Sequence, residues 1–171
     1  MANNLVFLEE QETDGLASSL NLTNIFGKGY DEYRIFLKMI DANTNGGYMG
    51  IRVYDNSDTL VTGSEYQYGA QHMKDYGSFD NTWYSTSTTQ IAPIHLGMND
   101  DNRGGGGLLR IFNADVAQYT FFTCESATFM DSGMEASRLS GCHMTAEIIS
   151  GIQLLPQSLT VHYRASVFGV T

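Results

Sequence analysis

Short stretches in which polar and apolar residues alternate run through this chain, and no long stretch carries the 3.6-residue period of a helix. The clearest stretch is 30–42, where Tyr33, Ile35, Leu37 and Met39 would share one face of a strand. Glycine, asparagine and aspartate separate the stretches, and these residues are typical of turns. The pattern therefore predicts an all-β protein.

The number of alternating stretches indicates the architecture. About eight strands joined by short turns are typical of an antiparallel jelly-roll-like β-sandwich. We expect this domain over residues 16–171, preceded over residues 1–15 by an N-terminal arm that is first apolar and then acidic. The whole chain has 171 residues, which suits one ordinary domain.

Composition excludes several functional classes. Hydrophobic residues make up 42% of the chain, enough for a core, whereas the net charge is −10. No cluster of Lys and Arg is present, which argues against nucleic acid and against an anionic membrane surface as partners. No apolar run is long enough to span a membrane, and the N-terminus does not resemble a secretory signal. We therefore expect assembly in a reducing cytoplasm, with Cys124 and Cys142 as free thiols.

The residue types that carry catalysis or metal binding lack the spacing that such chemistry needs. Asp41–Gly46 matches the first half of a calcium loop, but Arg52 stands where the motif needs glutamate. An asparagine-rich turn is the main interpretation of this segment, and weak cation binding at Asp41–Asn45 is the alternative. The four histidines are not spaced as metal ligands, and no nucleophile motif is present. Gly104–Gly107 lacks the Lys-Ser/Thr of a phosphate loop. We expect no enzymatic activity, no metal and no cofactor.

One cluster of aromatic residues is a candidate binding site for carbohydrate. Aromatic faces stack on sugar rings, and the chain is rich in Ser, Thr and Asn, whose side chains bond hydroxyl groups. The alternative is that these aromatics are ordinary sheet residues, because tyrosine favours half-buried strand positions. The cluster consists of Tyr66, Tyr68, Tyr76, Trp83 and Tyr84.

Three segments resemble a known family. YDEYRIFLKMI (30–40), EYQYGAQHM (65–73) and IISGIQLLPQSLTVHYRASVFGV (148–170) are similar to a small jelly-roll domain of virion structural proteins of tailed bacteriophages. The resemblance covers roughly residues 28–170 and implies a β-sandwich without catalytic residues. It is carried at the C-terminal end by Gly151, Ile152, Leu154, Val161, Tyr163, Val167, Phe168 and Gly169.

The resemblance implies a noncatalytic virion protein, and we expect a capsid decoration (cement) protein on the head exterior. Its partner would be the major capsid protein, and the protein itself would be a homo-oligomer, most simply a trimer. The predicted contact with the capsid or a neighbour is the apolar run Leu5, Val6, Phe7 and Leu8, which could add a strand to an exposed sheet edge. In the alternative interpretation, this segment packs against its own sandwich.

Two other functions remain open at this stage. The first is a tail-fibre or receptor-binding module that recognises host surface glycan through Tyr76, Trp83 and Tyr84. The second is an enzyme that cleaves surface polysaccharide, for which no set of catalytic residues is evident. Binding to a glycan array would distinguish the first from a decoration protein, and activity on polysaccharide would identify the second.

Overall fold

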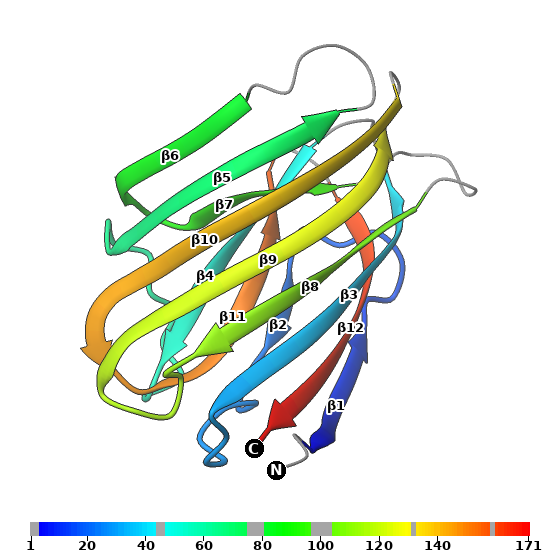
Figure 1. The fold of residues 1–171 in the computed structure, drawn as a ribbon. Coiled ribbons are helices and arrows are strands. Elements are labelled where there is room, and N and C mark those ends of the chain that lie inside the picture. Colours follow the sequence, from blue (N-terminus) through cyan, green and yellow to red (C-terminus); the bar gives the residue numbers. More distant parts are fainter. Residues whose placement is uncertain (1–3, 44–46, 75–80, 97–103, 131–132, 158–159) are drawn as a thin grey trace.

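Two antiparallel β-sheets face each other across one apolar core (Figure 1). The computed structural model describes residues 4–43, 47–74, 81–96, 104–130, 133–157 and 160–171. Strands joined by turns make up these ranges, so the predicted all-β antiparallel sandwich is confirmed. Across the described ranges, no helix has the length and apolar character needed to cross a membrane.

The larger sheet has eight strands and the smaller sheet has four. Along the larger sheet the order is β1 (Leu5–Glu12), β12 (Val161–Val170), β3 (Glu32–Ala42), β8 (Gly105–Phe112), β9 (Gln118–Met130), β10 (Gly133–Glu147), β5 (Tyr66–Lys74) and β6 (Asn81–Thr88). Along the smaller sheet the order is β2 (Leu20–Leu22), β11 (Ile149–Pro156), β4 (Gly47–Asp55) and β7 (Ile91–Leu96).

The structure describes twelve strands, against about eight that the sequence predicts. Two of the additional strands are β1, which is the predicted arm, and the short β2 that follows it. The other two arise because the chain changes sheet inside two of the predicted runs. Residues 82–96 read as one strand, but a bend at Thr89 and Gln90 divides them into β6 of the larger sheet and β7 of the smaller sheet. Residues 143–156 divide in the same way between the end of β10 and β11. Period-two alternation continues across such a bend, so the pattern alone does not reveal it.

Strands from the two ends of the chain pair in a nested series. β3 pairs with β12, β4 pairs with β11 and β5 pairs with β10, all antiparallel. The nesting is that of a long antiparallel ribbon rolled into two sheets, which is how a jelly roll is built.

Alternation along β3 assigns each side chain to the core or to solvent as the sequence predicts. Tyr33, Ile35 and Leu37 are buried against the smaller sheet, whereas Phe36 and Lys38 are exposed on the opposite face. β12 and β9 alternate in the same way, so the larger sheet has one face in the core and one face in solvent.

The segment predicted as an N-terminal arm is an edge strand of the larger sheet. Residues Leu5–Glu12 form β1, which pairs antiparallel with β12. Glu12, the last residue of β1, holds this strand against β12. Arg164 Nε donates to Glu12 Oε2 at 2.6 Å, and His162 Nε2 lies 2.9 Å from Glu12 Oε1. The hydrogen bonds of Arg164 and His162 lower the pKa of Glu12. The structure therefore has the alternative arrangement, in which this segment packs on its own sandwich.

Asp115, in the turn between β8 and β9, organises the loop that enters β3. Its carboxylate accepts hydrogen bonds from the backbone N–H groups of Gly27 at 2.7 Å, Gly29 at 2.6 Å and Tyr30 at 3.2 Å. The Tyr33 hydroxyl also donates to it at 2.7 Å, and burial together with Asp115 raises the pKa of Tyr33. Gly27 and Gly29 both have φ of 78°, a region that glycine enters without steric cost.

We expect Asp115→Ala to lower the free energy of unfolding by about 2 kcal/mol, because three N–H groups and a half-buried hydroxyl lose a charged acceptor. Urea denaturation monitored by circular dichroism measures the change. Asp14→Ala is the matched control, since Asp14 is exposed beyond the end of β1. Equal midpoints for the two variants would contradict the role given to Asp115.

Candidate functional site

Large apolar side chains gather on the outer face of the eight-stranded sheet, the face turned away from the smaller sheet. Alternation brings most of them there, since those on β3, β9 and β10 each lie next to a buried residue of the same strand. Phe7 is placed there by its pairing with Phe168, and Tyr84 by its pairing with Gly69. Aromatic residues and methionine are enriched at protein interfaces relative to the rest of a surface, so this face is the candidate binding surface. Its exposed members are Leu5, Phe7, Phe36, Tyr84, Tyr119, Phe121, Phe129 and Met134.

Three phenylalanines form a chain of edge-to-face contacts at the β1 end of this face, here called the phenylalanine cluster. Phe7 and Phe168 have ring centroids 5.5 Å apart with planes at 69°, and Phe168 and Phe36 have centroids 5.4 Å apart with planes at 86°. The rings come from three neighbouring strands, β1, β12 and β3. Phe7 is 57% exposed and Phe36 is 43% exposed, so the cluster presents aromatic surface to solvent.

The predicted contact residues at the N-terminus divide between solvent-exposed and core-packed positions. Leu5, Val6 and Phe7 are exposed, whereas Leu8 packs against the core. β1 is the last strand of its sheet in the described part of the chain, so one of its edges is open to another strand. The run therefore keeps an accessible surface although it is paired with β12.

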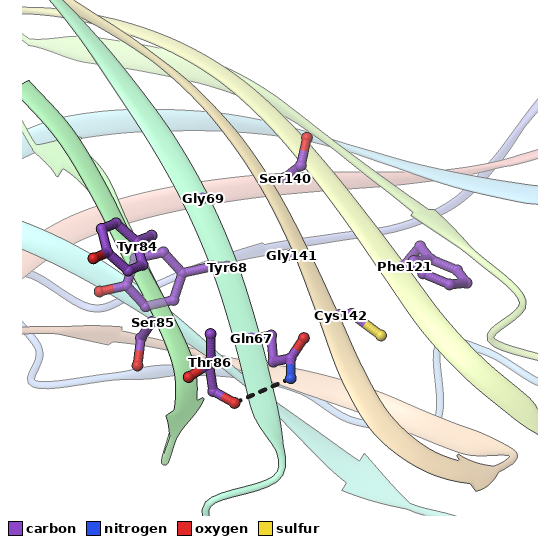
Figure 2. A pocket seen from close by; sticks show the side chains of 10 residues that line it. All are labelled: Gln67, Tyr68, Gly69, Tyr84, Ser85, Thr86, Phe121, Ser140, Gly141 and Cys142. Carbon is purple, nitrogen blue, oxygen red and sulfur yellow. Dashed lines mark hydrogen bonds between the residues drawn. The ribbon is translucent and has the colours of Figure 1, made fainter.

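A shallow hollow of about 330 Å³, here called the Tyr84 groove, lies near the opposite end of the outer face. Figure 2 shows Tyr84 on one side and Phe121 on the other, with β5 and β10 between them. Gly69 lies directly opposite Tyr84 in the pairing of β5 with β6, and a Cβ at Gly69 would meet no atom within 4 Å. The groove is thus open above Gly69, and its other polar lining residues are Gln67, Ser85, Thr86 and Ser140.

The described members of the aromatic cluster predicted as a carbohydrate site are only partly brought together: Tyr68 and Tyr84 both line the Tyr84 groove, whereas Tyr66 and Trp83 do not. Trp83 points into the sandwich, where its ring stacks on His72 with centroids 5.4 Å apart, whereas Tyr84, the next residue, is 77% exposed on the outer face. Tyr66 is fully buried, its hydroxyl donates to the carbonyl of Val61, and burial raises its pKa to about 12. Tyr76 lies outside the described residues. Adjacent residues of a strand point to opposite faces, which is why the cluster separates.

The described histidines and cysteines do not form a reactive or metal-binding group. His143 is buried, with Nε2 2.8 Å from Glu147 Oε1, and burial lowers the pKa of His72. Within the described ranges, no three His, Cys, Asp or Glu side chains lie close enough to hold a metal ion. The predicted cation turn is only partly covered, because the Asp41 side chain and residues 44–46 lie outside the described part.

Cys124 and Cys142 are free, as the sequence predicts. Cys124 is buried in the core face of β9, and Cys142 lines the Tyr84 groove on the outer face of β10. Their side chains therefore lie on opposite sides of one sheet.

The residues that sequence reasoning missed are those that only strand pairing brings together. The alternating pattern places Phe36, Phe121 and Phe168 on the outer face of their strands. It does not show that Phe168 lies between Phe7 and Phe36, because that depends on how β1, β12 and β3 pair. From the sequence, Gly69 is interpreted as a possible β-bulge. Its position opposite Tyr84 follows only from the register of β5 with β6.

No protein-family model and no curated protein sequence matches this chain. Among solved structures, the chain has a weak similarity to the CBM2 module of the evolved Dit of Lactobacillus casei BL23 phage J-1. The match has 12% sequence identity and a TM-score of 0.23, and covers 87% of this chain and 68% of that chain. This TM-score is too low to indicate a shared fold, so what that module binds has no bearing on the sites described above.

We expect the two thiols of the native protein to differ in reactivity. Burial raises the pKa of both thiols, and it raises that of Cys124 to about 12, so the Cys124 thiolate is scarce at pH 8. Cys142 is only partly buried and lines the groove, where reagent can reach it, whereas Cys124 lies in the core. Reaction with Ellman's reagent should therefore titrate one thiol rapidly, and both after unfolding without reductant. Cys142→Ser should remove the rapid phase. Equal rates for the two native thiols, or a disulfide-linked peptide in mass spectrometry, would contradict this assignment.

Proposed function

We propose that this chain is a noncatalytic structural protein of a phage virion, which decorates the exterior of the head and attaches through the β1 end of the eight-stranded sheet. The observation that carries the proposal is the phenylalanine cluster beside the open edge of β1. The sequence resemblance to jelly-roll virion proteins supports the same class of function.

The β1 end offers two kinds of contact to a partner. The phenylalanine cluster supplies aromatic surface, and buried aromatic anchors supply much of the affinity of protein interfaces. The open edge of β1 supplies unpaired backbone groups, to which a partner strand can bond. Leu5 and Phe7 are exposed on this edge strand, where side chains of an added strand would contact them.

The proposed partner is the major capsid protein, and the proposed assembly is a trimer, as expected from the sequence. A capsid repeats one surface many times, so each contact can be weak. A trimer that presents three β1 ends at once gains affinity from the second and third contacts without any new interaction.

Deletion of residues 1–14 is a poor test of this proposal, because it removes a paired strand of the sheet. It would break the ion pair of Glu12 with Arg164 and expose the edge of β12. Reduced attachment of that variant would not distinguish a lost contact from a damaged fold. Substitution of exposed side chains avoids the difficulty.

We expect the double variant Phe7→Ser/Phe36→Ser to bind empty heads at least about tenfold more weakly than the unmodified protein, because it removes aromatic anchors. Co-sedimentation with heads that lack the protein measures the affinity, and circular dichroism checks the fold. Phe129→Ser is the matched control, since Phe129 is an exposed phenylalanine of β9, several strands away.

Equal co-sedimentation of the double variant and the control would rule out the phenylalanine cluster as the contact. Cryo-electron microscopy of particles gives the independent test of location. Density for the protein over the head supports decoration, and density only at the tail would rule it out.

A further inference from the structure

The Tyr84 groove continues into a second hollow, and together they form a trough across the outer face. The second hollow has a volume of about 280 Å³, and both hollows are lined by Ser140. Its other lining residues include Thr123, Arg110, Glu125 and Arg138.

The pairing of the strands aligns the trough as a single row of side chains. Tyr84 lies opposite Gly69, which lies opposite Ser140. Ser140 lies opposite Thr123, which lies opposite Arg110. The row runs across β6, β5, β10, β9 and β8, and at the usual strand spacing it is about 19 Å long. The middle of the row has the small residues Gly69, Ser140 and Thr123. Tyr84 stands at one end and Arg110 at the other, so the two ends of the trough differ in chemistry.

The trough crosses the strands over their faces, so its floor offers no backbone hydrogen bonds. The N–H and C=O groups of β5, β10 and β9 there are engaged in the sheet ladders. A peptide that binds by adding a strand needs a free edge, and this site has none. A ligand in the trough must instead be recognised by side chains. Its long axis would cross the strands at a steep angle.

The Tyr84 end suits a sugar ring. Tyr84 is 77% exposed and Phe121 is 47% exposed, and they flank the open space above Gly69. The C–H faces of a pyranose pack on such rings. Ser140 lies between them with an exposed hydroxyl group, and Gln67 Nε2 donates to the carbonyl of Thr86, which leaves Gln67 Oε1 to accept from a ligand hydroxyl.

The Arg110 end carries positive charge, although the protein as a whole has a net charge of −10. Arg34 forms two hydrogen bonds with Glu32, at 2.9 and 3.1 Å, and Arg110 Nε lies 3.8 Å from the same carboxylate. Two guanidinium groups thus share one carboxylate and leave one positive charge. The other charged residues of this end, Arg138 and Glu125, neutralise each other at 2.9 Å. A guanidinium in this position fits a carboxylate of the ligand.

We infer that the trough binds an acidic oligosaccharide, with a sugar ring on Tyr84 and a sugar carboxylate at Arg110. The trough shares no lining residue with the phenylalanine cluster, although its Arg110 end adjoins that cluster on the neighbouring strand β3. The inference does not depend on where the protein sits on the virion. The trough overlaps the aromatic cluster that the sequence suggested at Tyr68 and Tyr84, but Trp83 packs against the core and has no part in it.

The test is isothermal titration calorimetry of the full chain with three probes: oligogalacturonate, a neutral galactan oligosaccharide of the same length, and polyglutamate. We expect oligogalacturonate to bind and the neutral oligosaccharide to bind more weakly. We also expect bound oligogalacturonate to slow the reaction of Cys142 with Ellman's reagent, because Cys142 lines the trough. Absence of oligogalacturonate binding, or equal binding of polyglutamate, would overturn the inference.

Three variants locate the ligand. Tyr84→Ala should weaken binding of oligogalacturonate about tenfold, the loss expected for one stacked ring. Arg110→Gln should weaken oligogalacturonate but leave the neutral oligosaccharide unchanged. Gly69→Val should abolish binding of both, because the new side chain fills the floor, and a β-branched residue suits an exposed strand position with free space above it.

Each variant has a matched control outside the trough. Tyr119→Ala removes another exposed tyrosine of the outer face, and Gln71→Val places valine at the next outward position of β5. Both controls should bind oligogalacturonate like the unmodified protein. Undiminished binding by a folded Gly69→Val would overturn the location of the site, and equal loss of both oligosaccharides in Arg110→Gln would overturn the role of its charge.

Discussion

The pairing of β3 with β12 is the contact on which the rest of the larger sheet depends. It joins strands from the two ends of the chain, and both sides of the sheet are built outward from it: β1 pairs with β12, and β8 pairs with β3. Its core face brings Ile35 opposite Val167 and Leu37 opposite Ala165, all of them buried. A shift of one residue in this register would turn these side chains to solvent, so burial itself fixes the register.

The same register determines what the outer face presents. With Ile35 and Val167 in the core, Phe36 and Phe168 must point outward, where Phe168 lies between Phe36 and Phe7. On the other side of β3, the outward positions follow from pair to pair through Arg110 and Thr123 to Ser140 and beyond. The two proposed sites are thus consequences of one alignment, which the core enforces from the opposite face of the sheet.

The two sites differ in the chemistry that they offer. The β1 end has aromatic surface and an open strand edge, which suit a protein partner. The trough has isolated aromatic rings, a floor without side-chain bulk and a positive end, which suit a polar, extended ligand. The Arg110 end of the trough adjoins the phenylalanine cluster, since Leu108 lies opposite Phe36. The Tyr84 end lies at the far side of the sheet, on β6, so attachment through the β1 end would leave that end of the trough accessible from solvent.

Local alternation was enough to predict the class of fold. Tyr33, Ile35, Leu37 and Met39 are buried as the pattern of β3 indicates, and the two cysteines are free. Such predictions succeed because apolar side chains recur at every second residue in a strand that has one buried face. This is a local property, which a short segment of sequence displays by itself.

Tertiary structure alone decided which residues meet. Trp83 and Tyr84 are neighbours in sequence but lie on opposite faces, whereas Tyr84 and Arg110 belong to one row through three intervening strands. The run Leu5–Leu8 looked like a free arm because no local signal shows that β12 offers it an edge. The sequence by itself therefore determined the all-β class and the face of many side chains. Pairing between distant strands decided the binding surfaces, because register depends on the whole core and not on any one segment.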